Sequence, residues 1–189
     1  MTRPAAPAGD SVLRTELLPP AAGDDSAVVS WLTDLVNNVY SVAEKGLWAD
    51  GATRTSAAGV ADLTRAGEIA VAARGERLLG CVRIRQLDDN VSEFGMLAVD
   101  PSHRGTGVGR QLVRFAEQRG REMGCGAMQL ELLVPLEWKH PSKEFLAQWY
   151  ARMGYTADST GSPGELYPSL APLLVTPCEL IIYRKNIGD

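Results

Sequence analysis

The chain has 189 residues, a length that fits one compact domain. Its 45% hydrophobic and 22% charged residues are typical of a globular protein, and they exclude collagen-like, mucin-like and wholly disordered chains. With 19 Lys and Arg against 23 Asp and Glu, the net charge of −4 argues against a general attraction to nucleic acid or to anionic membranes.

Apolar stretches and cysteine usage predict a cytoplasmic protein. No apolar stretch approaches the roughly 18 to 20 residues that span a bilayer, and the first residues lack the apolar core of a signal peptide. Cys81, Cys125 and Cys178 are far apart and odd in number, which favours reduced thiols over a disulfide framework. His103 and His140 are too few and too separated for a histidine-rich centre, so we expect no metal.

Turn residues and apolar periodicity divide the chain into elements. Residues 1–10 are rich in Ala, Pro and Gly and are expected to form a mobile arm, which leaves a single domain over residues 11–189. Apolar steps of three and four residues predict helices, and short apolar runs between turn residues predict strands. The predicted elements, in chain order, are a strand over 11–18, a helix from Asp24-Asp25-Ser26 to Val42, a helix over 56–65, strands over 69–73, 78–87 and 91–99, a helix from Gly107 to Gly124, a strand over 128–134, a helix over 142–153 that opens at Ser142, a strand from Tyr155, a short helix around 165–173 and a strand over 179–184. This order predicts an α/β or α+β layered domain with a mixed sheet.

The most informative segment is a glycine-rich turn between a predicted strand and a predicted helix, residues 101–110. Glycines let a ligand approach the backbone closely, and the first turn of a helix offers unpaired N–H groups, so this arrangement favours phosphate binding. Five arginines between Arg104 and Arg121 add positive charge in an acidic protein, although a solvated basic helix is the simpler alternative. A Walker loop is excluded because no lysine lies between Lys45 and Lys139, and a dinucleotide fingerprint is excluded because Arg110 stands where the last glycine is needed.

Two segments of the chain carry a resemblance to a known family. Residues 104–109 read Arg-Gly-Thr-Gly-Val-Gly, and residues 149–155 read Trp-Tyr-Ala-Arg-Met-Gly-Tyr. Both resemble motifs of the GCN5-related N-acetyltransferase (GNAT) family, in the family's order and with a strand between them. The resemblance covers about residues 11–185. It implies a mixed, mostly antiparallel twisted sheet, flanked by helices and splayed open at an acetyl-CoA site.

The resemblance also implies which residues bind acetyl-CoA, the co-substrate. The main chains of Leu97, Ala98 and Val99 would pair with the pantetheine arm, and the backbone of the turn would hold the pyrophosphate. The turn residues are Arg104, Gly105, Thr106, Gly107, Val108, Gly109 and Arg110. The remaining CoA phosphate could meet Arg110 or Lys143. One departure is the missing asparagine early in the helix over 142–153, where Ser142 or Lys143 stands instead.

Two residues are candidates for acid–base chemistry. Glu93 lies six residues before Val99, at the spacing where some family members carry their base, and strand alternation predicts that it shares a face with Leu97 and Val99. The alternatives are a solvated glutamate at a strand end, or water as the base. Tyr150 matches the family's tyrosine near the CoA sulfur and could protonate the departing thiolate, while a core aromatic is the simpler interpretation. No cysteine has a histidine nearby in sequence, which favours direct transfer in a ternary complex over an acetyl-cysteine.

The resemblance predicts an acetyl-CoA-dependent N-acetyltransferase that acts on a primary amine, small molecule or peptide. A non-catalytic acyl-CoA-binding or sensor module is the main alternative, and transfer to a hydroxyl or of a longer acyl group stays open. We expect no nucleic-acid or membrane partner. The sequence does not decide between a monomer and a homodimer. The acceptor is not identified by the sequence: small amines, an aminoglycoside, an amino acid and a protein N-terminus all fit.

Overall fold

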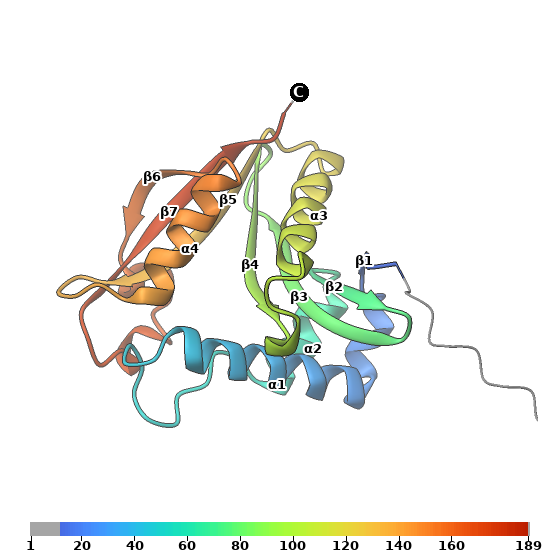
Figure 1. Cartoon of the computed structure of the whole chain (residues 1–189), viewed down its shortest axis with the longest axis horizontal. Helices are drawn as coiled ribbons and strands as arrows, with labels where there is room; N and C mark the ends of the chain where they lie inside the picture. Colours follow the sequence, from blue (N-terminus) through green and yellow to red (C-terminus); the bar gives the residue numbers. More distant parts are fainter. Residues whose placement is uncertain (1–11, 189) are drawn as a thin grey trace, which may run out of the picture.

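The computed structural model describes residues 12–188, in which seven strands form one sheet with helices against both faces (Figure 1). The predicted mobile arm, residues 1–10, lies outside the described residues. The strands are β1 (Arg14–Leu17), β2 (Ile69–Arg74), β3 (Arg77–Gln86), β4 (Val91–Val99), β5 (Ala127–Pro135), β6 (Thr156–Gly161) and β7 (Cys178–Asn186). The helices are α1 (Ser26–Ala43), α2 (Ala57–Arg65), α3 (Val108–Glu122), α4 (Pro141–Arg152) and α5 (Pro163–Leu166), with short 3-10 turns η1 (Pro20–Asp24), η2 (Pro101–His103) and η3 (Ala171–Leu173).

The sheet is mixed and mostly antiparallel, which confirms the predicted fold class. Its strand order is β1-β2-β3-β4-β5-β7-β6. Every neighbouring pair runs antiparallel except β4 and β5, which are parallel. Helix α3 is the crossover between these two strands, as a parallel pair requires.

Two apolar cores lie on opposite faces of the sheet. Successive side chains of a strand point to opposite faces, and β3 illustrates the division. Cys81 belongs to the core that α1 and α2 cover, together with Val36, whereas Val82 belongs to the core that α3 and α4 cover, together with Leu112. The site therefore has α1 on one side of the sheet and α3 and α4 on the other.

Local capping residues explain where most helices begin. The Asp25 side chain accepts from the backbone N–H groups of Ala27 and Val28 and starts α1, and the Ser56 hydroxyl accepts from the Gly59 N–H and starts α2. Each cap satisfies N–H groups that have no partner inside the helix. Both starts agree with the predicted helices.

Most predicted boundaries differ from the structure by one or two residues, and the differences at β1, α4 and the segment after β6 are described here. The first strand was expected over residues 11–18 and is shorter, Arg14–Leu17. Helix α4 begins one residue before the expected Ser142, because the His140 ring accepts from the Ser142 N–H and Pro141 occupies the first turn, where its missing N–H costs nothing. The short helix expected around 165–173 is split into α5 and η3, since Pro168 lacks the N–H that a continuous helix needs.

Candidate functional site

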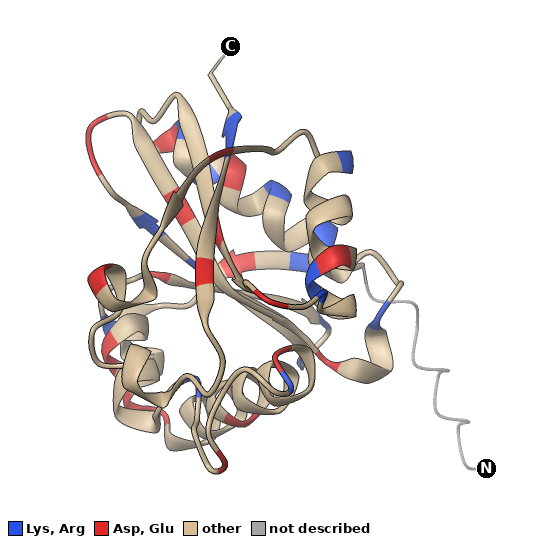
Figure 2. Ribbon diagram, turned by 90° about the vertical axis from the view of Figure 1, so that its left-hand side faces the viewer, with Lys and Arg blue, Asp and Glu red and all other residues tan. Residues whose placement is uncertain are grey.

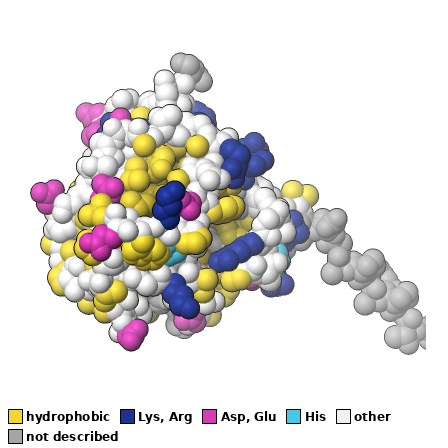
Figure 3. All heavy atoms as spheres, turned by 60° about the vertical axis from the view of Figure 1, so that its left-hand side comes forward, with side chains coloured by type: hydrophobic (Ala, Val, Ile, Leu, Met, Phe, Trp, Pro, Cys, Tyr) yellow, Lys and Arg dark blue, Asp and Glu magenta, His cyan; other side chains and the backbone are white. Residues whose placement is uncertain are grey.

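The site is an opening between β4 and β5. The two strands pair only at their starts, from Val91 opposite Ala127 to Glu93 opposite Gln129. Beyond that point β5 stays with β7 and β4 stays with β3, so the edge of β4 after Glu93 has no partner strand among the described residues. A cavity of about 810 Å³ follows this opening, and hydrophobic side chains gather on the same side of the molecule with Lys and Arg side chains among them (Figure 3).

The two ends of the cavity differ in the elements that line them. The turn end is lined by His103, Arg104, Gly105, Gly107, Gly109 and Arg110. The α1 end is lined by Tyr40, Glu44, Arg54, Glu93, Glu131 and Tyr167. Between them lie Leu97, Val99, Val108, Lys143, Trp149 and Tyr150. Of the residues predicted to bind acetyl-CoA, only Ala98 and Thr106 do not line the cavity.

A bulge in β4 changes which side chains share a face. Met96 has a positive φ of 48°, and the register with β3 slips between Cys81 and Arg83. An extra residue at a bulge reverses the alternation that follows it. Leu97 and Val99 therefore pack against the core under α3, whereas Glu93 faces Arg85 on the other face. The predicted common face of Glu93, Leu97 and Val99 is wrong for this reason.

The turn end is built mainly from backbone. Gly105 and Gly107 have φ values of 78° and 89°, which side chains other than glycine adopt with strain. Gly107 is the N-cap of α3 and provides no side-chain hydrogen bond, so the first N–H groups of the helix stay available to a ligand. The Arg104 and Arg110 side chains are exposed beside them. This combination of free N–H groups and positive charge suits a phosphate.

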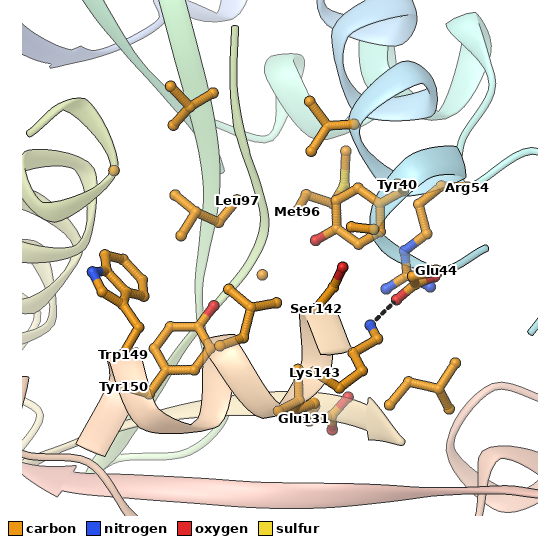
Figure 4. A pocket seen from close by; sticks show the side chains of 18 of the residues that line it. Tyr40, Glu44, Arg54, Met96, Leu97, Glu131, Ser142, Lys143, Trp149 and Tyr150 are labelled. Atoms are coloured by element: carbon orange, nitrogen blue, oxygen red, sulfur yellow. Dashed lines mark hydrogen bonds and ion pairs between the residues drawn. The ribbon is translucent and has the colours of Figure 1, made fainter. Parts of the chain in front are cut away.

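Helix α4 brings Tyr150 into the middle of the cavity. Its ring lies among Phe94, Tyr155 and Tyr183, with centroids 6.0, 6.1 and 6.4 Å away, and the residue is only 6% exposed. Figure 4 shows the Tyr150 hydroxyl turned from α4 toward β4 near Leu97. No described residue forms a hydrogen bond with this hydroxyl. Burial, and to a lesser degree the Tyr40 hydroxyl, raises the pKa of Tyr150, so the phenol stays protonated.

Glu93 is a buried, paired carboxylate. It is 7% exposed, and its oxygens accept from Arg85 at 2.8 Å and from the Gln129 amide at 3.3 Å. The alternative of a solvated strand-end glutamate is therefore wrong. Burial raises the pKa of Glu93, the Arg85 guanidinium counteracts part of this effect, and the nearby Glu131 carboxylate raises the pKa further. Acidic and basic residues lie on the strands of the sheet as well as on the helices (Figure 2).

The α1 end contains residues that the sequence did not single out as catalytic. Glu131 lies two residues after Gln129 on β5, so it shares a face with Glu93's partner, and it accepts a hydrogen bond from the Tyr167 hydroxyl. Arg54 comes from the loop after α1, and its guanidinium lies 5.2 Å from the centre of the Tyr40 ring. These residues come from four separate parts of the chain. Only an alternation-based search for acidic residues on β5 could have found Glu131.

A buried ion pair joins α4 to the end of α1. Lys143 Nζ donates to Glu44 at 2.7 Å, with both side chains about 5% exposed, and the Trp48 indole donates to the same carboxylate at 2.6 Å (Figure 4). Lys143 is one of the two residues, with Ser142, that stand where the family's asparagine was expected. Its ammonium is already paired with Glu44, whereas Arg110, the other cation that the sequence left open, has an exposed side chain.

The family comparison shows which family this chain belongs to. The model described as "Acetyltransferase (GNAT) family" matches residues 32–155, which include β4, the glycine turn, α3, β5 and α4. The chain belongs to the GNAT family. This GNAT protein is an acetyltransferase that uses acetyl-CoA, and the predicted resemblance is confirmed. Comparison with curated proteins found no match.

Solved structures of acetyltransferases share the fold of this GNAT chain. An aminoglycoside 6'-N-acetyltransferase complexed with coenzyme A is 15% identical, with a TM-score of 0.68 over 94% of this chain and 98% of that one. YncA, described as a putative acetyltransferase, from Salmonella typhimurium with its cofactor acetyl-CoA is 13% identical, with a TM-score of 0.64 over 95% and 96%. Ard1 from Thermoplasma volcanium is 14% identical, with a TM-score of 0.62 over 94% and 99%. At these identities the likeness concerns the fold.

Two further observations bear on metal and membrane. Within residues 12–188, no three His, Cys, Asp or Glu side chains are grouped so that they could hold a metal ion. Over the same range, no helix has both the length and the apolar character needed to cross a membrane.

Proposed function

We propose that this protein transfers the acetyl group of acetyl-CoA to a primary amine, by direct attack of the amine in a ternary complex. The observation that carries the proposal is a single cavity that joins a glycine turn, a buried tyrosine and a buried carboxylate. The turn end suits the phosphates of CoA, and the α1 end suits an amine. The proposal assigns residues 11–189 to one acetyltransferase domain.

Acetyl-CoA would lie along the open edge of β4. Backbone groups of Leu97, Ala98 and Val99 would bond to the pantetheine arm as an added strand does. Ala98 fits this role although its side chain does not line the cavity, because only its main chain is used. The N–H groups from Arg104 to Gly109 would hold the pyrophosphate, and the Arg110 guanidinium would meet a further phosphate.

The amine would approach from the α1 end. Its nitrogen attacks the thioester carbonyl carbon, a carbon–nitrogen bond forms, and the carbon–sulfur bond then breaks. Glu93 accepts the proton that the amine nitrogen loses, directly or through a water molecule. An alkylamine has an ordinary pKa near 10.4, so about one molecule in a thousand is free base at neutral pH, and a carboxylate at this position would help. The raised pKa of Glu93 makes it a stronger base than an exposed glutamate.

Tyr150 would supply the proton for the departing thiolate. Its pKa is raised by burial, which on its own makes the phenol a weaker acid. The thiolate would form in the same poorly solvated place, however, and desolvation raises the pKa of a thiol as well. The proton then passes from the Tyr150 oxygen to the sulfur, the negative charge passes to the Tyr150 oxygen, and solvent returns a proton to that oxygen when the products leave.

An acetyl-cysteine intermediate has less support. Cys81 is buried on the α1 face, and burial raises its pKa to about 12, so almost none of it is thiolate at neutral pH. Cys125 is also buried, and Cys178 is partly exposed but has its pKa raised by burial.

Measurement of CoA release with a panel of amines tests the proposal. We expect turnover with at least one amine and tight acetyl-CoA binding by calorimetry. Tight binding without turnover across the panel would favour the alternative, an acyl-CoA sensor.

A further inference from the structure

Arg54 is the cation of the α1 end that has no carboxylate partner. It lies in the loop between α1 and α2, is half-buried, and stacks over the Tyr40 ring at 5.2 Å (Figure 4). No carboxylate of residues 12–188 lies within 4.0 Å of its guanidinium. Burial raises the pKa of Tyr40 to about 12, and the positive charge of Arg54 opposes that rise.

The acidic residues around Arg54 are already bonded to other groups. Glu44 accepts from Lys143 and from the Trp48 indole. Glu131 accepts from the Tyr167 hydroxyl. Arg54 also interacts with the Tyr40 side chain, but a half-buried guanidinium whose neighbouring acids are bonded elsewhere still has donors for a ligand.

We infer that Arg54 binds a carboxylate of the acceptor, so that the substrate is an amine that also carries a carboxylate, as an amino acid does. The inference rests on the proposed acetyl transfer and specifies its acceptor. The reacting nitrogen would lie toward Glu93 and Glu131, which favour a positive charge, and the acceptor's carboxylate would lie toward Arg54. Opposite charges at the two ends of one molecule would orient it in the cavity.

The charges of the cavity favour a carboxylate over a phosphate. Glu44, Glu93 and Glu131 all line the α1 end, and a doubly charged phosphate would meet more repulsion from them than a singly charged carboxylate. A carboxylate also matches the planar guanidinium in two parallel hydrogen bonds. A second cavity of about 230 Å³, which shares Tyr40, Glu44 and Arg54 with the first, leaves room beyond Arg54 for the rest of the acceptor.

The test compares amino acids with their own carboxamides. CoA release is measured for each amino acid and its amide, and for one amine that carries a phosphate, with the wild type and with Arg54→Gln. We expect the wild type to prefer the carboxylate form, and Arg54→Gln to raise KM for that form on the order of 10- to 100-fold while KM for the amide changes little. Arg54→Lys keeps the positive charge but lacks the planar guanidinium, so its KM for the carboxylate form should lie between those of the wild type and Arg54→Gln.

Arg74→Gln is the matched control, because Arg74 is an exposed arginine at the end of β2 and does not line either cavity. Thermal unfolding of each variant separates a binding defect from a loss of the fold. Equal effects of Arg54→Gln on acid and amide, or a wild type without preference, would overturn the carboxylate assignment. Faster, Arg54-dependent acetylation of the phosphate-bearing amine would overturn it too. Acetyl-CoA binding without turnover of any amine would contradict the proposed acetyl transfer instead.

Discussion

The turn end and the α1 end of the cavity are built in different ways. At the turn end a ligand meets the backbone of one continuous segment, in which Gly105 and Gly107 hold conformations that favour glycine. At the α1 end a ligand meets side chains from α1, the loop after it, β4, β5 and the segment after α5. Backbone recognition leaves a local pattern in the sequence, whereas side-chain recognition depends on residues that only folding brings together. Substitutions should therefore affect cofactor binding at one end and chemistry or acceptor choice at the other.

Gly107→Glu should have the largest effect, and only at the turn end. A carboxylate at the N-cap of α3 would stand where a phosphate binds, and the positive φ adds strain. We expect acetyl-CoA affinity in calorimetry to fall by about 10³-fold or more, since like charges in contact cost several kcal/mol. Gly124→Glu is the matched control, because Gly124 also has a positive φ, 85°, and has no heavy atom within 4 Å of a Cβ, but it lies after the far end of α3. Equal loss of affinity in both variants would assign the effect to strain.

Tyr150→Phe should leave acetyl-CoA affinity unchanged and lower turnover. If the hydroxyl protonates the thiolate, kcat and kcat/KM should fall together by about 10²- to 10⁴-fold. Tyr183→Phe is the matched control. It removes a hydroxyl from the same aromatic cluster, with ring centres 6.4 Å apart, and Tyr183 does not line the cavity. If Tyr150→Phe turns over as fast as the wild type while chemistry is rate-limiting, Tyr150 is a packing residue and not the proton donor.

Glu93→Gln should lower kcat/KM by about 10²-fold near neutral pH, at the low end of the range for a general base. The loss should shrink as rising pH supplies free amine. In the wild type, activity should fall on the acid side as Glu93 takes up a proton. Because burial raises the Glu93 pKa above its ordinary value of 4.5, that fall should begin at a higher pH than for an exposed glutamate. Glu68→Gln is the control, since Glu68 pairs with Arg83 at 2.6 Å outside the cavity. A loss independent of pH would assign Glu93 to structure.

Arg110→Ala should have the smallest effect, a roughly 2- to 5-fold weaker acetyl-CoA affinity that fades in high salt, because an exposed ion pair contributes little. Arg152→Ala, an exposed arginine that does not line the cavity, should change nothing. A much larger effect of Arg110→Ala would mean that side-chain charge, rather than backbone, dominates the turn end.

The contrast between the two ends also explains what the sequence could predict. The glycine turn, the strand before it and the helix after it depend on local conformational preferences, so β4 and α3 were predicted nearly to the residue. Tyr150 could be proposed from the sequence because it lies in a short motif, and the structure places it on the lining of the cavity. The partner of Lys143 could not be found, since Glu44 lies 99 residues away and nothing local indicates that the two meet.

The prediction that Glu93 shares a face with Leu97 and Val99 was wrong for a different physical reason. Strand alternation was the correct rule, but one bulge residue, Met96, reversed it, and methionine carries no signal for a positive φ. Bulges are set by how two strands are paired, which a single strand's pattern does not contain.

The bulge also constrains the length of β4. A strand with one extra residue consists of two halves with opposite parity, so the positions before Met96 and those after it are out of phase while that residue is present. Deletion of Met96 would bring the halves into a single phase and exchange the faces of Leu97, Ala98 and Val99 relative to Glu93. An insertion would do the same. A change of one residue in length here is therefore expected to be more harmful than most substitutions, even though it would remove no side chain that touches a reacting atom.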